Sequence, residues 1–373
     1  VLLLNFFSFF YTRNGYYTIM AVTMHVAALL FMYFLSLHLT GKSAFRLLLL
    51  TALSGVLVSI ETWSQFYDTS LLFQWMTPGS MVVGTIGNSN YLGAYLLFPL
   101  TAFTALLFLL KGKLRWAAGA LWVFVFSALL FSRARAAWVG VAVAVPGLFH
   151  SVMKIHGFSI KAYLRSKSRH ARLYGLSVLT LFGGLWAIAP QRFRVMMGFS
   201  NVTNPATFML RTEKYFQASW WLFKQSPLFG TGLWSYRNMV YEAQAELERA
   251  HRDFFKGYPE PKPRRVHNEY LETLNDGGLL AGMVLLLFVG VVLRHGLAVI
   301  RKENVPTPER ILASAAFYSL VGILVVALFF FPFRLNSTLF MTVLMMAVTE
   351  GLYLRHFGRI EKLRLLLPGC RPG

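Results

Sequence analysis

The chain has 373 residues, of which 56% are hydrophobic, 16% aromatic and only 14% charged. This composition is too apolar for an ordinary soluble domain of that length, so we expect the lipid bilayer to be its solvent. A net charge of +21 could indicate nucleic-acid binding. The basic residues fall between apolar runs, however, and membrane topology explains most of them. The single cysteine, Cys370, excludes an intrachain disulfide.

Nine stretches are apolar and long enough to cross about 30 Å of hydrocarbon as helices. They cover residues 17–38, 45–62, 91–110, 116–132, 137–153, 173–190, 277–298, 311–331 and 336–354. The predicted fold is therefore an all-α, polytopic membrane helical bundle. A long polar loop, 190–276, separates a first membrane part, 1–189, from a second, 277–373, which ends in a basic tail.

The lysines and arginines of the short connections orient this bundle, because short basic loops stay in the cytoplasm. Most of them lie in one set of alternate connections, which includes 154–172 and the tail from Arg355. That face is predicted to be cytoplasmic, so the C-terminus is inside and the loop 190–276 is extracytoplasmic. Nine spans place Val1 outside without a signal peptide, and we therefore expect further spans upstream of it.

Two arginines, Arg133 and Arg135, lie in a short turn on the face where the positive-inside rule disfavours them. Two interpretations stay open. Their side chains could extend to the lipid headgroups, as arginines near span ends commonly do. Alternatively, they form an anion site at the membrane surface, because a guanidinium group binds phosphate oxygens in a bidentate way.

Within the loop, residues 205–225 are predicted to form a helix along the membrane surface, with a proline in its first turn. A stripe of aromatic side chains on this helix is expected to face the membrane. It comprises Phe208, Tyr215, Phe216, Trp220 and Phe223. Arg211 and Lys214 lie towards its N-terminal end, where the helix dipole favours an anion, although a solvated basic face explains them equally well. The segment SPLFGTG, 226–232, then predicts a tight turn that allows a close backbone approach.

The loop returns to the membrane through RRVHNEYLETLNDGGLLAG, residues 264–282, which places His267 close to the bilayer. A lone histidine is more often structural than catalytic. Here Arg264 and Arg265 disfavour the imidazolium, so we expect a neutral His267 that can accept a proton. It is the candidate general base.

Several chemistries lack their sequence motifs. The chain has no D-x-D, no H-E-x-x-H, no cysteine cluster, no Walker loop and no G-x-S-x-G, so metal hydrolysis, ATP coupling and serine chemistry have no support. We predict neither a metal nor a cofactor. An ion-coupled transporter normally needs several buried carboxylates, and the predicted spans carry few, with Glu350 near an inner end.

Four segments of the chain form a recognisable series. The first two are TIGNSNYLGAY (85–95), with Asn88 and Asn90, and ARAAWVG (134–140). The others are Arg211 followed by an aromatic helix and PLFGTG, with Gly230 and Gly232, and HNEYLETLNDGGLLAG (267–282), with Asn268 and Gly278. Together they resemble the O-antigen ligase/polymerase family, membrane glycosyltransferases of the GT-C-like kind, in the family's order and with the large loop in the family's place. Ala134 stands where the family often has serine, which makes Arg135 a better match than Arg133 to the family's arginine.

The resemblance implies a metal-independent, inverting transfer of glycan from a polyprenyl-pyrophosphate carrier, such as undecaprenyl pyrophosphate, to an acceptor hydroxyl. The reaction takes place on the outer face of a bacterial inner membrane. Family members have about twelve spans, in agreement with spans upstream of Val1. His267 is then the general base, and the pyrophosphate is held by Arg135, Arg211, Arg265, Arg264 and Arg133. The asparagines and glycines of the four segments support this site.

The acceptor stays open. A ligase acts on lipid A core, a polymerase on a growing glycan, and an O-oligosaccharyltransferase on a protein hydroxyl. A different class, a lipid or polysaccharide transporter or flippase, would move the carrier without chemistry and needs a polar path through the bundle. The expected partners are membrane lipid, the glycan donor and the acceptor, and no nucleic acid.

Overall fold

The structure is a computed structural model, which describes residues 10–12, 14–72, 81–158, 214–254, 256 and 265–358. Within these residues the regular structure is helical, and a short 3-10 helix, η2 (Pro332–Arg334), joins the last two long helices. The predicted all-α fold is confirmed.

Eight helices of the described part are long and apolar enough to cross a membrane. They are α2 (Gly15–His38), α3 (Gly41–Phe66), α4 (Ser89–Leu109), α5 (Gly112–Phe131), α6 (Arg135–Ile155), α13 (Glu269–Arg301), α14 (Thr307–Ala327) and α15 (Asn336–Phe357). Each coincides with one of the predicted spans, so the chain is a multi-pass membrane protein. The remaining predicted span, 173–190, lies outside the described residues.

Polar residues begin several of these helices. Thr40, Asn88 and Asn268 each accept a hydrogen bond from a backbone N–H in the first turn of the helix that follows. Those N–H groups have no partner within the helix, and a short polar side chain satisfies them at little conformational cost. Helix α14 instead has a proline in its first turn, where no backbone donor is needed.

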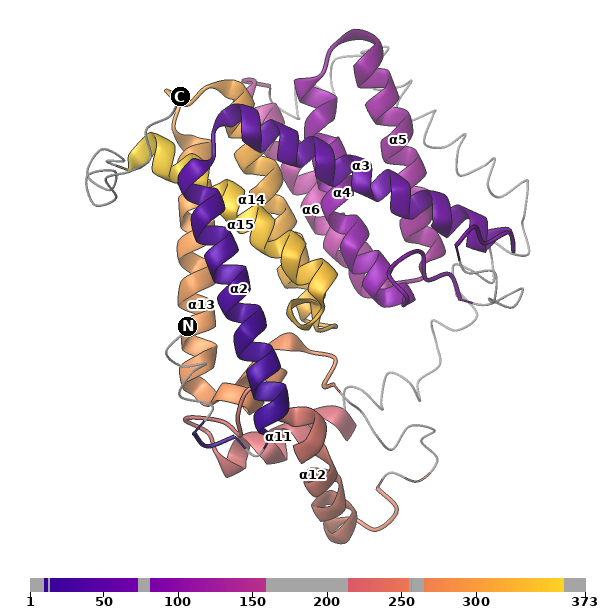
Figure 1. Ribbon diagram of the computed structural model, residues 1–373, viewed down its shortest axis with the longest axis vertical. Helices are drawn as coiled ribbons and strands as arrows, with labels where there is room; N and C mark the ends of the chain where they lie inside the picture. The colour runs from indigo at the N-terminus through magenta and orange to yellow at the C-terminus, as the bar shows by residue number, and fades with distance from the viewer. Residues whose placement is uncertain are drawn as a thin grey trace.

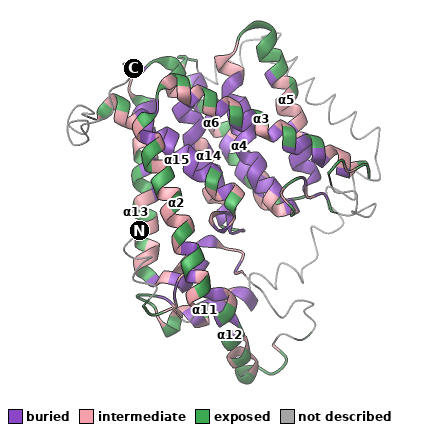
Figure 2. Ribbon diagram, viewed as in Figure 1, coloured by how far each residue is buried: buried purple, intermediate pink, exposed green. Residues whose placement is uncertain are grey.

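Helix α4 forms the centre of the bundle, as its almost continuous burial in Figure 2 shows. Helices α6 and α14 pack against it and against each other. A Cβ added at Gly140 on α6 would lie 2.8 Å from the carbonyl oxygen of Gly322 on α14. Because both residues are glycines, the two backbones approach closely, which is how helices pack tightly in a membrane.

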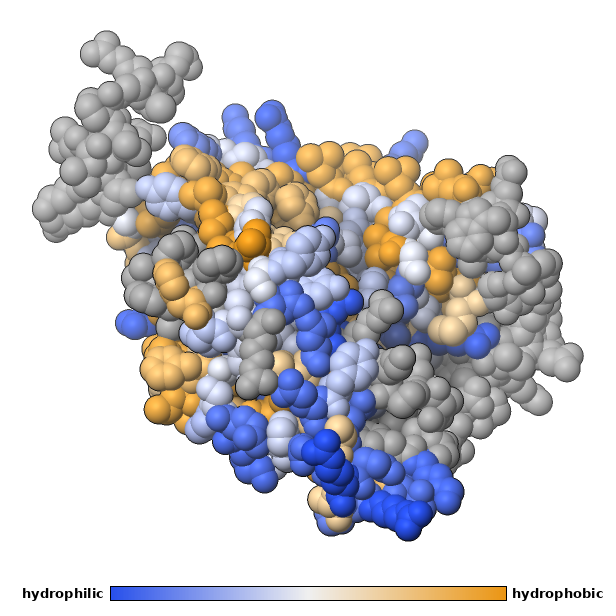
Figure 3. Space-filling model, turned by 60° about the horizontal axis from the view of Figure 1, so that its bottom comes forward, coloured by the Kyte–Doolittle hydropathy of each residue, from blue (hydrophilic) through white to orange (hydrophobic). Residues whose placement is uncertain are grey.

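The helices of the loop, α11 (Phe216–Gln225) and α12 (Tyr236–Ala250), lie together at one end of the bundle, here called the loop end (Figure 1). They share a small hydrophobic cluster with Val266, separate from the core of the bundle. Figure 3 brings this end forward and shows hydrophilic side chains gathered over it, with hydrophobic ones on the bundle behind. The loop therefore folds as a polar cap with its own core.

The predicted surface helix needs one correction. Of residues 205–225, the structure describes those from Lys214 onward, and α11 begins at Phe216. Trp220 is 54% exposed, as expected for the stripe, but Tyr215 is only 3% exposed. Tyr215 lies three and seven positions before Ala218 and Leu222, so it shares their buried face and points into the cap.

Candidate functional site

His267 lies at the loop end, immediately before the N-cap of α13. Its ring stacks on Tyr215, with 6.1 Å between ring centroids, and meets the ring of Phe331 edge-on at 5.4 Å. Its backbone has a φ of 59°, a left-handed conformation that is uncommon for residues other than glycine. An aromatic pair thus holds the candidate base in a specific orientation.

The first family-like segment lies beside these aromatic neighbours. Asn88 accepts hydrogen bonds from the backbone N–H groups of Asn90 and Tyr91 and so fixes the start of α4. The ring of Tyr91 then meets that of Phe331 at 6.0 Å. Phe331 is therefore in ring contact with Tyr91 on one side and His267 on the other.

The start of α4 also contacts the second segment. A Cβ at Gly93 would overlap that of Ala134, in the turn between α5 and α6. This packing places Arg133 and Arg135 at the same end of the bundle as the start of α4. Both arginines are exposed, and neither forms an ion pair with a side chain of the described residues. Their guanidinium groups remain available to an external anion.

The third and fourth segments pack back to back. Thr231 N–H donates to the carbonyl of Asn275, and Leu279 N–H donates to that of Pro227, each at 2.8 Å. A Cβ at Gly230, whose φ is 70°, would lie 2.5 Å from the backbone of Asp276. The glycine-rich turn after α11 thus packs its backbone directly against the first part of α13. This contact accounts for the close backbone approach predicted for the turn.

Gly278 supports the same contact. Its φ of 63° interrupts the helical backbone of α13, and a Cβ there would collide with the backbone of Leu228. The span predicted at 277–298 begins at this interruption, so residues from Glu269 to Gly277 form a separate short helix in the cap. Gly232 packs in the same way on Thr12.

Arg265 is already engaged within the protein. Its Nη1 donates to Glu272 Oε1 at 2.9 Å, and its guanidinium carbon lies 5.2 Å from the ring of Trp234. Within the described residues, the other N–H groups of Arg265 form no hydrogen bond. Two other predicted anion ligands, Arg211 and Arg264, lie outside the described residues.

A buried cluster of charges next to His267 was not predicted from the sequence. Arg334 of η2 donates to Glu269 at 2.9 Å and to Asp276 at 2.6 Å. Its Nε also lies 3.3 Å from Glu272. Burial disfavours the charged guanidinium, but Glu272, Asp276 and Glu269 outweigh that effect and raise the pKa of Arg334. The spacing of the three carboxylates on one helix face was the available signal.

Tyr236, on the first turn of α12, lies against this cluster. Its side chain is fully buried, and burial together with the charges of Glu272 and Tyr215 raises the pKa of its hydroxyl. The phenol is therefore neutral across the physiological range. Asp276 accepts from the backbone N–H groups of Trp234 and Tyr236 and so anchors the start of α12 to α13.

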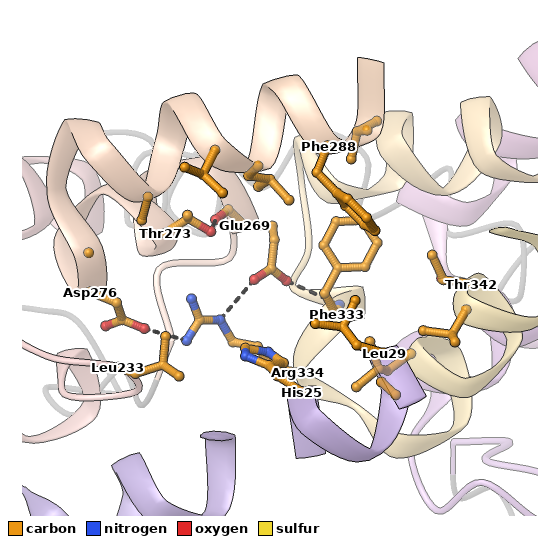
Figure 4. Close-up of a pocket in the computed structure, with 18 of the residues that line it drawn as sticks. His25, Leu29, Leu233, Glu269, Thr273, Asp276, Phe288, Phe333, Arg334 and Thr342 are labelled. Atoms are coloured by element: carbon orange, nitrogen blue, oxygen red, sulfur yellow. Dashed lines mark hydrogen bonds and ion pairs between the residues drawn. The ribbon is translucent and has the colours of Figure 1, made fainter. Parts of the chain in front are cut away.

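Two cavities open near these residues. One, of about 180 Å³, lies between α2, α13 and α15, with mostly apolar walls and a polar end formed by His25, Glu269, Asp276 and Arg334 (Figure 4). The other, of about 1130 Å³, lies in the cap between α11, α12 and the 226–232 turn. Its lining includes Trp221, Phe229 and Glu242. The first suits an apolar group and the second a larger, partly polar one.

Part of the chain matches a known protein family. Residues 120–287 match the family described as O-antigen ligase, a stretch that includes the turn at Arg135, both cap helices and His267. None of the curated proteins matches the chain. The match supports a membrane enzyme that transfers glycan, with membrane lipid and glycan-related substrates as partners. Over residues 120–287 this chain is therefore similar to the O-antigen ligase family.

Proposed function

We propose that this protein transfers a glycan from a polyprenyl-pyrophosphate carrier to an acceptor hydroxyl, on the extracytoplasmic face of a bacterial inner membrane. The observation that carries the proposal is the setting of His267. Its imidazole is held between Tyr215 and Phe331 at the loop end, and the exposed arginines of the Arg133–Arg135 turn lie at the same end of the bundle. A proton acceptor and unpaired cations at one end of a membrane bundle suit the transfer of a group from a lipid-linked phosphate.

In the proposed step, the acceptor hydroxyl attacks the anomeric carbon of the glycan from the face opposite the carrier. The bond between that carbon and the phosphate oxygen breaks, and the pyrophosphate leaves with the electron pair. His267 takes the proton of the attacking hydroxyl. Such general-base assistance contributes roughly 100-fold to 10,000-fold, and attack from the opposite face inverts the anomeric configuration.

The leaving group needs charge stabilisation and no proton, because pyrophosphate is a weak base. Guanidinium groups supply this stabilisation through bidentate hydrogen bonds in a site of low dielectric constant. Arg135 and Arg133 are exposed and available for that role. Arg211, Arg264 and the free donors of Arg265 complete the proposed anion site, so the transfer proceeds without a metal.

The acceptor is expected in the larger cavity of the cap. Aromatic faces such as Trp221, beside polar groups such as Gln225 and Glu242, suit the apolar faces and hydroxyl groups of sugars. This favours a saccharide acceptor, as in a ligase or a polymerase, over a protein hydroxyl.

Purified protein, a polyprenyl-pyrophosphate glycan and separate candidate acceptors test the proposal, with transferred sugar and released carrier as the two readouts. His267→Ala and His267→Asn are compared in parallel, because asparagine tolerates the left-handed backbone of this position better than alanine does. Both variants are expected to lose roughly 100-fold or more of the transfer rate. Transfer at the wild-type rate by His267→Asn would refute the proposed role of this residue.

Three further measurements separate the parts of the proposal. Arg211→Ala and Arg135→Ala are expected to raise the KM for the donor. Loss of transfer in EDTA that Mg²⁺ or Mn²⁺ restores would contradict the metal-independent step. For orientation, Arg249→Cys in a Cys370→Ser background is expected to react with an impermeant thiol reagent on intact spheroplasts, since Arg249 is exposed on α12. Protection of that cysteine would invert the topology.

A further inference from the structure

The buried charge cluster joins parts of the chain that lie far apart in the sequence. Arg334 is 8% exposed and Glu272 is fully buried. Arg334 follows Glu269 by 65 positions and Asp276 by 58. A buried charge is tolerated where its partners satisfy it. The cluster therefore forms only when η2 and the short helix before Gly278 are both in place.

The three carboxylates of the cluster hold different segments. Glu269 accepts from the backbone N–H of Phe333, at 3.1 Å, and so ties α13 to η2. Asp276 ties α13 to the start of α12. Glu272 instead forms hydrogen bonds with the segment that precedes His267.

Glu272 holds that segment by two bonds. Its Oε1 accepts from Arg265 Nη1 at 2.9 Å, and its Oε2 accepts from the backbone N–H of Val266 at 3.1 Å. Val266 is fully buried in the hydrophobic cluster of the cap. The two residues immediately before His267 are thus fixed by one carboxylate, and Arg334 Nε lies 3.3 Å from the same Oε1 that accepts from Arg265.

This attachment matters because of the backbone of His267. A residue with a Cβ that is held at a positive φ relaxes towards the extended or right-handed region when its surroundings permit. The hold on Arg265 and Val266 opposes that relaxation at the adjacent peptide. A displacement of the imidazole by about 1 Å is enough to lower the rate of a positioned step roughly 100-fold.

We infer that Glu272, held by Arg334, is a positioning residue of the transfer site, and that it sets the place of the His267 imidazole through Arg265 and the Val266 amide. The inference rests on the proposed function, in which His267 is the general base. Glu272 itself is buried and contacts neither donor nor acceptor.

The test compares two matched variants, Glu272→Gln and Glu269→Gln. Both carboxylates are buried, both lie on the same helix turn and both interact with Arg334, so their loss is expected to lower the unfolding temperature in detergent to a similar extent. Transfer is measured well below the unfolding temperature of each variant, with kcat and the donor KM determined separately. Glu272→Gln is expected to lower kcat by roughly 10-fold to 100-fold with little change in KM, and Glu269→Gln by much less.

A double variant adds a readout that a purely structural role does not move. If Glu272 acts by placing the His267 imidazole, Glu272→Gln combined with His267→Asn lowers kcat no further than His267→Asn alone does. Multiplicative losses of kcat would overturn the inference, as would equal losses of kcat in Glu272→Gln and Glu269→Gln.

The wild type and His267→Asn are measured beside these variants. A wild type that releases no carrier, or a His267→Asn variant with normal transfer, contradicts the proposed function. When both controls behave as expected and Glu272→Gln resembles Glu269→Gln, the positioning inference alone is wrong.

Discussion

The core around α4 and the cluster around Arg334 are both buried, but different forces hold them. In α4, Leu92, Leu96 and Phe98 have no exposed surface and touch apolar neighbours, so dispersion and close packing stabilise the region. In the cluster, one guanidinium meets three carboxylates. A packed apolar core tolerates the loss of a small apolar group. A charge cluster that loses one partner instead keeps a buried charge without compensation. The cap is therefore the more fragile region, and it carries His267.

The largest effect on stability is expected from Arg334→Met. Methionine fills much of the same space but leaves Glu269 and Asp276 buried without their cation, while Glu272 keeps only Arg265, which costs about 3–5 kcal/mol. Thermal unfolding in detergent measures it, and limited proteolysis of the cap shows where the structure opens. A variant as stable as the wild type would mean that the cluster contributes little. Arg334→Lys is the control that keeps the charge and loses the bidentate geometry.

A smaller effect is expected where the bundle is overpacked. Gly140→Val places a side chain into Val326 and the backbone of Gly322, and such overpacking costs about 1–3 kcal/mol. Gly290→Ala on α13 is the matched control, because nothing lies within 4 Å of a Cβ at that position. It is expected to leave stability unchanged or to raise it slightly, since alanine is the better helix former. Equal destabilisation by both variants would show that the loss of stability arises within each helix and not from the packing between helices.

The glycine turn of the cap should respond to a single methyl group. Gly230→Ala meets both a φ of 70° and the backbone of Asp276, whereas Gly112→Ala meets a φ of 56° and open space. The conformational penalty alone is about 1 kcal/mol, so Gly112→Ala isolates it. Unfolding temperatures of the pair are expected to show a clearly larger loss for Gly230→Ala, and a loss of transfer that Gly112→Ala lacks. Similar losses would contradict the back-to-back packing.

The smallest effect is expected at the exposed end of α12. Arg249 and Glu246 form an ion pair between exposed side chains three residues apart, and pairs of this kind contribute only a few tenths of a kcal/mol, if anything. Arg249→Ala should leave both the unfolding temperature and the transfer rate as in the wild type. A marked loss of either would show that α12 has a partner on that side.

Apolar runs of sufficient length predicted eight spans that the structure describes, because helix length and hydropathy are local properties. The kink at Gly278 lies one residue after the predicted start of its span. The inward orientation of Tyr215 was not predicted, since an aromatic stripe does not show which side of a helix is covered. Nor was the partnership of Arg334 with Glu272, because their pairing depends on how distant segments meet. Motif order indicated His267 and Arg135, but Phe331, whose ring contacts both His267 and Tyr91 of α4, carries no sequence signal.

The left-handed backbone of His267 has a practical consequence for chemical rescue. Glycine prefers the φ of 59° that histidine adopts here with difficulty, so His267→Gly removes the base and relaxes the chain in one change. The variant also leaves a slot of imidazole shape between Tyr215 and Phe331. Free imidazole from solution is expected to occupy that slot and to restore part of the lost transfer, which transfer rates of His267→Gly with and without imidazole would measure. The residue with the unfavourable backbone conformation, His267, is thus the one whose imidazole we expect to be replaceable from solution.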